Sequence, residues 1–111
     1  MTGLAGKTCT PCRSGVPPLD RVAAERYLRE APGWVLQDEG KRIERRFQLK
    51  SFRDALALVN RIGALAEEEG HHPDISFGWG YVVVSLHTHK IKGLHENDFI
   101  MATKINRMAE G

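Results

Sequence analysis

Hydrophobic residues recur at helical spacing in some segments of the chain and at strand spacing in others. Together these segments predict seven secondary-structure elements. The predicted helices, with hydrophobic residues every three or four positions, are 19–29, about 51–69 and about 96–109. The predicted strands, with alternating hydrophobic and polar residues, are 34–37, 41–50, 75–77 and 81–88. The order α-β-β-α-β-β-α predicts an α+β domain, in which three helices pack on one face of a four-stranded antiparallel sheet.

The long central helix has the clearest boundaries. Ser51 is predicted to cap its start and Gly70 to end it, and Pro73 prevents it from continuing. The predicted buried face of this helix consists of Phe52, Ala55, Leu56, Val59, Ile62 and Ala66. The predicted end of this helix therefore places residues 71–73 immediately after its last turn.

Composition changes this picture mainly at the N-terminus. Residues 1–16 are rich in glycine, proline and serine, which predicts a flexible tail before a single domain over 17–111. The chain is 41% hydrophobic and 27% charged, and no apolar run approaches the ~20 residues of a membrane span. The N-terminus lacks the apolar stretch of a signal peptide, so we expect a cytoplasmic protein. A net charge of +2 gives no basis for nucleic-acid binding.

Two cysteines, Cys9 and Cys12, lie in this predicted tail within the sequence Cys-Thr-Pro-Cys. The functional interpretations are half of a zinc site or a redox pair. A structural zinc site needs four ligands, however, and the chain has no second cysteine pair. A thioredoxin-like pair follows a strand, and nothing before Cys9 resembles one. The favoured interpretation is a pair of reduced thiols.

All five histidines fall in one short stretch of the sequence: His71, His72, His87, His89 and His95. Histidine is the side chain best suited to moving protons near neutral pH. His71 and His72 follow the long helix, and Glu67 lies one turn upstream, where it is expected to orient or charge-pair with His71. His89 ends a strand of the next hairpin. This arrangement favours acid–base chemistry on a polar heterocycle.

A zinc site is the sharpest competing interpretation of these histidines. His87 and His89 alternate along a strand, and the His71–His72 pair supplies further nitrogen ligands. Adjacent histidines chelate poorly from one face, however, and no cysteine or aspartate completes a tetrahedron at the usual spacing. We therefore expect no metal. His87 is predicted to face solvent and His95 to start the last helix, which leaves three candidate catalytic histidines.

The spacing of this stretch resembles the signature of the pterin-4a-carbinolamine dehydratases, the 4a-hydroxytetrahydrobiopterin dehydratase family. That signature is an acidic residue, His-His-Pro, an aromatic residue six positions later, a histidine ten further on and an aspartate nine beyond. The matching residues here are His71, His72, Pro73, Trp79, His89 and Asp98. Many relatives carry an aspartate immediately before the two histidines. Gly70 occupies that position here, so Glu67 or Glu69 would have to substitute.

The resemblance, which covers roughly residues 16–108, implies a lyase that removes water from 4a-hydroxytetrahydropterin to give quinonoid dihydropterin. This reaction recycles the pterin cofactor of aromatic amino acid hydroxylases and needs no metal or redox cofactor. The implied catalytic residues are His71, His72 and His89, and we expect His72 and His89 nearest the C4a hydroxyl. The implied substrate-binding residues are Glu67, Trp79, Thr88 and Asp98.

The resemblance also implies a homodimer or homotetramer and an alternative function. Members of the family act as protein partners, including a transcription-factor dimerisation cofactor, and relatives are associated with Rubisco assembly. A non-enzymatic protein-binding module is therefore the alternative to a pterin dehydratase. The intact set of His71, His72 and His89 favours the enzyme.

Overall fold

The computed structural model describes residues 3–10 and 15–110 and confirms the predicted fold class and element order. The helices are α1 (Arg21–Leu28), α2 (Phe52–Glu69) and α3 (Glu96–Glu110). The strands are β1 (Val35–Gln37), β2 (Arg42–Gln48), β3 (Asp74–Gly78) and β4 (Tyr81–Leu86). Short 3-10 turns occur at Leu4–Gly6, Asp38–Gly40 and His89–Ile91.

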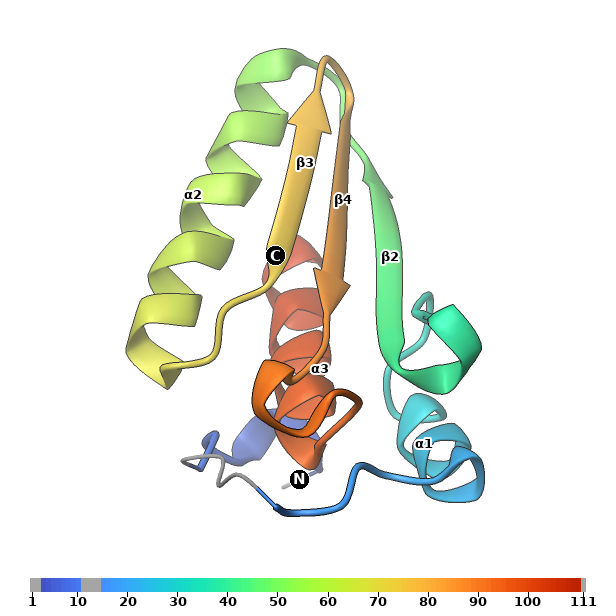
Figure 1. Ribbon diagram of the computed structural model, residues 1–111. Coiled ribbons are helices and arrows are strands. Elements are labelled where there is room, and N and C mark those ends of the chain that lie inside the picture. Colours follow the sequence, from blue (N-terminus) through green and yellow to red (C-terminus); the bar gives the residue numbers. More distant parts are fainter. Residues whose placement is uncertain (1–2, 11–14, 111) are drawn as a thin grey trace.

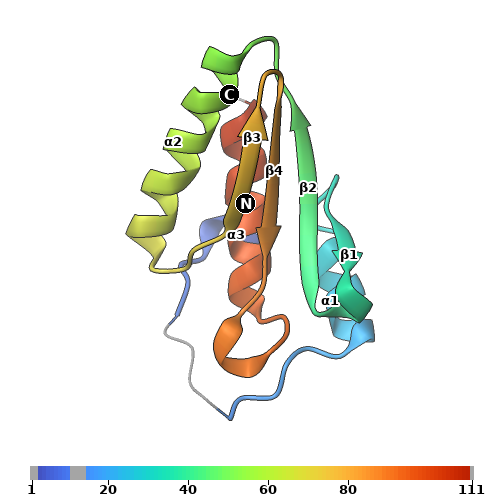
Figure 2. The ribbon, with the colours of Figure 1, turned by 45° about the horizontal axis from the view of Figure 1, so that its top comes forward.

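The four strands form one antiparallel sheet in the order β1-β2-β4-β3. Helices α2 and α3 cover one face of this sheet, as Figures 1 and 2 show. The register pairs Ile43 with Leu86 and Phe47 with Val82, so hydrophobic side chains of β2 and β4 lie together beneath the helices. One face of the sheet is therefore hydrophobic and covered by helices, as expected of an antiparallel sheet with helices on one side.

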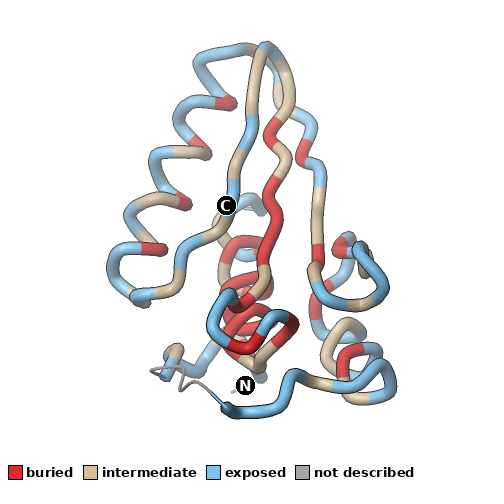
Figure 3. The backbone as a smooth tube through the Cα atoms, in the orientation of Figure 1, coloured by how far each residue is buried: buried red, intermediate tan, exposed pale blue. Residues whose placement is uncertain are grey.

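Helix α3 lies at the centre of the core, and its first half is buried on nearly all sides (Figure 3). Phe99, Ile100 and Met101 are all buried, although they are consecutive and point in different directions. The polar residues of its first turn, Asn97 and Asp98, are consequently buried as well. Buried polar groups need hydrogen-bond partners, and those partners build the site described below.

The buried face of α2 overlaps the predicted one but is rotated from it. Ala55, Ile62 and Ala66 are buried as expected, but Leu58 replaces Phe52 and Leu56, which are exposed. The helix packs against β3, β4 and α3, and its alanines permit close approach along a narrow stripe. Phe52 instead contacts the ring of Phe77 on the edge strand β3, with ring centroids 5.6 Å apart. Helical spacing alone did not fix the rotation of this helix.

The described part of the N-terminal segment packs against α3. Leu4 is buried, and the Lys7 Nζ lies 2.8 Å from the Glu96 Oε2. That residues 1–16 form a flexible tail stays a prediction, and Cys12 lies outside the described residues. Over residues 3–10 and 15–110, no helix is long and apolar enough to cross a membrane.

Candidate active site

The C-terminus of α2 fixes the backbone of the two adjacent histidines. Gly70 adopts a left-handed conformation (φ 67°), and its N–H donates to the Ala66 carbonyl at 2.9 Å. The His71 N–H donates to the same carbonyl at 3.3 Å, which completes a glycine-terminated helix cap. The chain then leaves the helix axis, so the His71 and His72 side chains no longer follow helical spacing. Pro73 leads directly into β3.

A closed loop after β4 holds the third predicted histidine. The Thr88 N–H donates to the Gly93 carbonyl at 2.8 Å, which joins the two ends of the loop over residues 88–93. His89 begins the 3-10 turn within it, and Ile91 and Leu94 are buried and anchor it to the core. A Cβ on Gly93 would lie 2.6 Å from Pro18, so the close packing there requires glycine.

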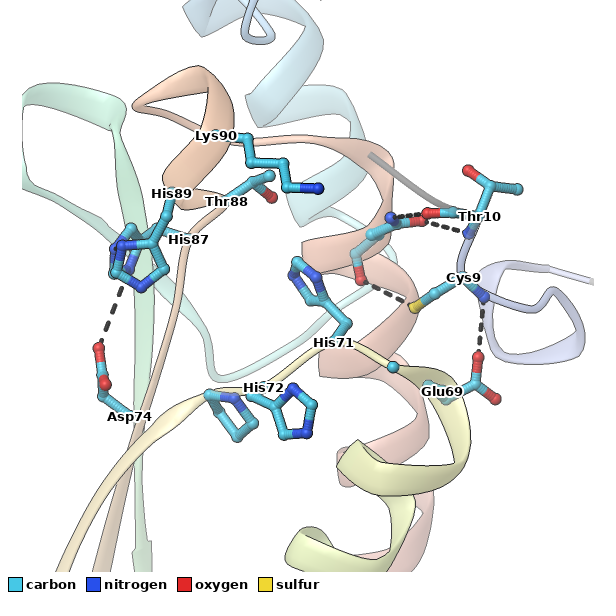
Figure 4. A pocket seen from close by; sticks show the side chains of 13 residues that line it. Cys9, Thr10, Glu69, His71, His72, Asp74, His87, Thr88, His89 and Lys90 are labelled. Atoms are coloured by element: carbon cyan, nitrogen blue, oxygen red, sulfur yellow. Dashed lines mark hydrogen bonds and ion pairs between the residues drawn. The ribbon is translucent and has the colours of Figure 1, made fainter. Parts of the chain in front are cut away.

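These two segments and the start of α3 enclose a pocket of about 600 Å³. Figure 4 shows His71 on one side of it and the His87–His89 pair on the other. The lining residues are Cys9, Thr10, Glu69, Gly70, His71, His72, Pro73, Asp74, His87, Thr88, His89, Lys90 and Asn97. The structure thus brings His71, His72, His89 and Thr88 to one pocket, as the sequence predicts.

Asp98 holds His71 from the buried side of the pocket. The Asp98 side chain is 0% exposed, and its Oδ1 lies 2.6 Å from Nε2 of His71, whose side chain is 12% exposed. Oδ2 accepts from the Thr88 hydroxyl at 2.9 Å and from the His95 N–H at 3.0 Å. The His95 side chain in turn accepts from the Asn97 N–H, so the side chains of His95 and Asp98 together cap the first turn of α3. Asp98 therefore both caps α3 and orients His71.

Glu67 pairs with His72 and not with His71, which corrects the sequence prediction. The Glu67 Oε2 lies 2.5 Å from the His72 Nε2. Both side chains are exposed, at 79% for Glu67 and 59% for His72. The reason for the difference is the left-handed Gly70, because it turns the chain so that His72 folds back towards the last turn of α2.

His87 was expected to be a bystander, but it lines the pocket and contacts His89. The His87 Nε2 lies 3.2 Å from the His89 Nδ1, and the ring centroids are 4.0 Å apart. The Asp74 Oδ2 lies 4.0 Å from the His87 Nδ1 on the other side (Figure 4). Strand alternation placed His87 away from the core, and only the pairing of β3 with β4 shows that Asp74 lies beside it. His95 caps α3 and is not among the pocket residues.

Trp79 does not reach the pocket within this chain, contrary to the sequence prediction. It lies in the β3–β4 turn and is 72% exposed. Figure 1 shows this turn at the end of the hairpin opposite to the loop that carries His89. Trp79 follows the entire length of β3, which carries it away from the His71–Pro73 segment.

Cys9, Glu69 and Asn97 also line the pocket, where the sequence predicted neither Cys9 nor Asn97. Glu69, named from the sequence as a possible partner of the adjacent histidines, binds Cys9 and Lys104 instead. The Cys9 N–H donates to the Glu69 Oε1 at 2.8 Å, and Lys104 binds the other carboxylate oxygen at 2.7 Å. Burial acts to raise the pKa of Glu69, but these two donors outweigh it and hold that pKa below its ordinary value. Burial, followed by the nearby Glu69 charge, raises the pKa of the Cys9 thiol to about 12. Cys9 is therefore a neutral thiol near pH 7, not a reactive thiolate.

The geometry of the pocket suits proton transfer to and from a molecule bound between two opposed imidazole groups. His71 has one ring nitrogen bound by a carboxylate, which leaves its second ring nitrogen to act as a base or acid. The His87–His89 pair offers the same chemistry on the opposite wall. Within the part of the chain that the structure describes, no three His, Cys, Asp or Glu side chains are grouped to hold a metal ion.

The fold and this pocket define an α+β protein with a histidine-lined pocket. Residues 17–108 match the family described as Pterin 4 alpha carbinolamine dehydratase, and the chain belongs to that family. A protein of Azoarcus sp. (strain BH72) named "Putative pterin-4-alpha-carbinolamine dehydratase" is 59% identical, over 98% of this chain and 93% of its own length. A relative with the same name, numbered 1, from Cupriavidus pinatubonensis is 56% identical, over 97% and 93% of the two chains.

Two solved structures share the fold. The "transcriptional coactivator/pterin dehydratase from Brucella Melitensis" is 33% identical with a TM-score of 0.79, and the match covers 83% of this chain and 98% of that one. A "pterin dehydratase-like protein" described as a RuBisCO assembly factor in the alpha-carboxysome is 27% identical with a TM-score of 0.61. That second match covers 72% of this chain and 93% of the other. Structures that share this fold are therefore described by roles besides catalysis.

Proposed function

We propose that this protein is a lyase that eliminates water from 4a-hydroxytetrahydropterin to give quinonoid dihydropterin, as a step in pterin cofactor recycling. The observation that carries the proposal is the His71–Asp98 pair, which faces the His87–His89 pair across a pocket of about 600 Å³. Membership of the pterin-carbinolamine dehydratase family supports the same reaction.

The reaction requires one proton to be delivered and one to be removed. The C4a–O bond breaks as its oxygen gains a proton and leaves as water. The proton on N5 is removed, and its bonding electrons form the C4a–N5 double bond. An acid and a base on opposite sides of the pterin meet both requirements, and such groups each contribute about 10²–10⁴-fold.

We assign His89 and His72 to the C4a hydroxyl and His71 to the N5 proton. In this assignment the Asp98 side chain accepts from the His71 Nε2–H, which leaves the Nδ1 lone pair as the base. Thr88 donates to Asp98 and thereby fixes the carboxylate. Glu67 pairs with His72 at the rim of the pocket, where both side chains are exposed and water weakens the pairing.

The test is a dehydration assay, in which the carbinolamine is generated in solution and its loss is followed by ultraviolet absorbance. We expect the protein to accelerate this loss above the spontaneous rate, and His71→Ala, His72→Ala or His89→Ala each to lower kcat about 100-fold or more. His95→Asn is the matched control, because it removes a histidine outside the pocket while keeping a side chain that caps helices. An unaccelerated reaction, or wild-type rates in all three alanine variants, contradicts the proposal.

A protein-binding role is the alternative, and the assembly-factor structure of the same fold is the observation that favours it. Absence of turnover, together with co-purification of a specific partner, would support this alternative. The predicted homodimer or homotetramer is tested separately by light scattering.

A further inference from the structure

A short N-terminal segment, Lys7–Thr10, lies against the pocket although it falls outside the residues that match the family. The family match begins at residue 17, yet Cys9 and Thr10 line the pocket next to His71 (Figure 4). The segment therefore adds a wall to a site whose histidines all belong to the matched region.

Asn97 binds the backbone of Thr10 through both ends of its side-chain amide. Its Oδ1 accepts from the Thr10 N–H at 3.0 Å, and its Nδ2 donates to the Thr10 carbonyl at 2.6 Å. The side-chain amide thus satisfies both backbone polar groups of Thr10, as a neighbouring strand would, and fixes the position of Thr10. Asn97 is buried at the start of α3, one residue before Asp98. The same helical turn therefore orients His71 and holds the added wall.

Cys9 ties the same segment to the end of α2. Its N–H binds Glu69, whose side chain is only 5% exposed and also pairs with Lys104. Its thiol points to the Asn97 carbonyl, with Sγ 3.7 Å from the oxygen. A buried carboxylate that loses a hydrogen-bond donor is destabilised, because water does not replace the donor. Glu69 therefore favours the position of Cys9 in which the Cys9 N–H is bound.

We propose that residues 7–10 form a substrate-binding wall of the pocket, held in place by Asn97 and Glu69. This inference rests on the proposed function, because the ligand it takes is the pterin ring. The wall contacts ground state and transition state alike, so it contributes to affinity and leaves the proton transfers to the histidines. Asn97 and Glu69 are accordingly positioning residues.

The first variant loosens the wall without changing Asn97 or Glu69. Thr10→Pro removes the N–H that binds Asn97. It is made in a Cys12→Ser background, so that Cys9 is the only thiol. We expect Cys9 to be alkylated by iodoacetamide about 10-fold faster. We expect KM for the carbinolamine to rise about fivefold with kcat within about twofold, and Kd for 7,8-dihydrobiopterin to rise equally.

Asn106→Ala is the matched control, because Asn106 is a buried asparagine on the same helix that bonds to Trp34 and Arg45 away from the pocket. It is expected to lower stability but to leave Cys9 alkylation, KM and Kd unchanged. Asn97→Ala is the second loosening variant and is expected to match Thr10→Pro.

Two outcomes overturn the inference alone. In the first, alkylation accelerates while KM and Kd stay at the wild-type values, so the segment is only a cover. In the second, neither loosening variant accelerates alkylation, so Asn97 does not hold the segment. A wild-type protein that neither turns over the carbinolamine nor binds 7,8-dihydrobiopterin contradicts the proposed function, and this inference falls with it.

Discussion

His71 and His72 are neighbours in sequence, and each has its Nε2 within hydrogen-bond distance of a carboxylate. The distances are nearly equal, 2.6 Å to Asp98 and 2.5 Å to Glu67. The surroundings differ completely. Asp98 is fully buried and held by two further donors, whereas Glu67 and His72 both project into solvent. Two pairs of nearly equal length therefore have unequal physical consequences.

The difference shows that burial, not distance, decides which pair orients a ring. Water screens an exposed pair, and two mobile side chains lose entropy when they form it, so such pairs contribute about 0–1 kcal/mol. A buried carboxylate cannot exchange its donors for water, and removing one partner leaves an uncompensated group. We therefore expect Asp98 to govern both stability and proton transfer, and Glu67 to matter little for either.

The largest expected effect is the loss of stability in Asp98→Ala. The substitution leaves the Thr88 hydroxyl, the His95 N–H and the His71 ring without their common acceptor. We expect the free energy of unfolding to fall by about 3 kcal/mol or more, measured by urea denaturation. A loss below about 0.5 kcal/mol would show that water replaces the carboxylate easily, and the contrast between the two pairs would disappear.

The second effect separates the two carboxylates by catalysis. Asp98→Asn keeps the shape of the side chain but removes the charge that fixes the protonated Nε2 of His71. We expect kcat for carbinolamine dehydration to fall about 100-fold, since orientation and tautomer of the base are both affected. Glu67→Gln is the matched control, with kcat within about threefold of wild type. Equal losses in the two variants would contradict the contrast.

A third carboxylate, Glu69, extends the comparison to pH dependence. Its folded-state pKa lies below the ordinary value of 4.5, so the unfolded chain takes up the proton first as pH falls. The stability that Glu69 contributes is therefore complete above pH 4.5 and is lost as pH falls through the lower folded-state pKa. We expect Glu69→Gln to be less stable than wild type at pH 7, and the gap to close in strong acid. Urea denaturation across this pH range measures the gap, and a constant gap would contradict the assignment.

The smallest expected effect is on stability in Glu67→Gln. Because Glu67 and His72 are both exposed, we expect the free energy of unfolding to change by no more than about 0.5 kcal/mol. The same urea denaturation measures it at low and moderate salt. A loss above about 1.5 kcal/mol would indicate that the exposed pair is as important as the buried one.

The order of elements was predictable because each one carries its own local signal. Ser51 caps α2 by accepting from the Asp54 N–H, and Gly70 ends it, as the sequence indicates. The partner of each histidine was only half predictable. Asp98 lies where a helix cap is expected, but the choice of Glu67 between His71 and His72 depends on how the chain turns after Gly70. Helical spacing contains no information about residues beyond the helix.

Long-range contacts account for what the sequence did not predict. Cys9 meets Glu69 across 60 residues of chain, and Thr10 meets Asn97 across 87. His87 reaches Asp74 only because β3 and β4 are paired. Trp79 does not reach the pocket of its own chain because the length of β3 lies between them, which spacing along the sequence does not reveal. Each of these depends on tertiary packing, which local patterns do not specify.

The most direct test of the account is a double-mutant cycle on kcat between His71 and Asp98. If Asp98 acts through His71, the two substitutions affect the same step and their effects are not additive. We predict that Asp98→Asn lowers the dehydration kcat about 100-fold in the wild-type protein but less than about threefold in a His71→Ala background. An undiminished 100-fold loss in the His71→Ala background would contradict the central claim that Asp98 positions His71 for proton transfer.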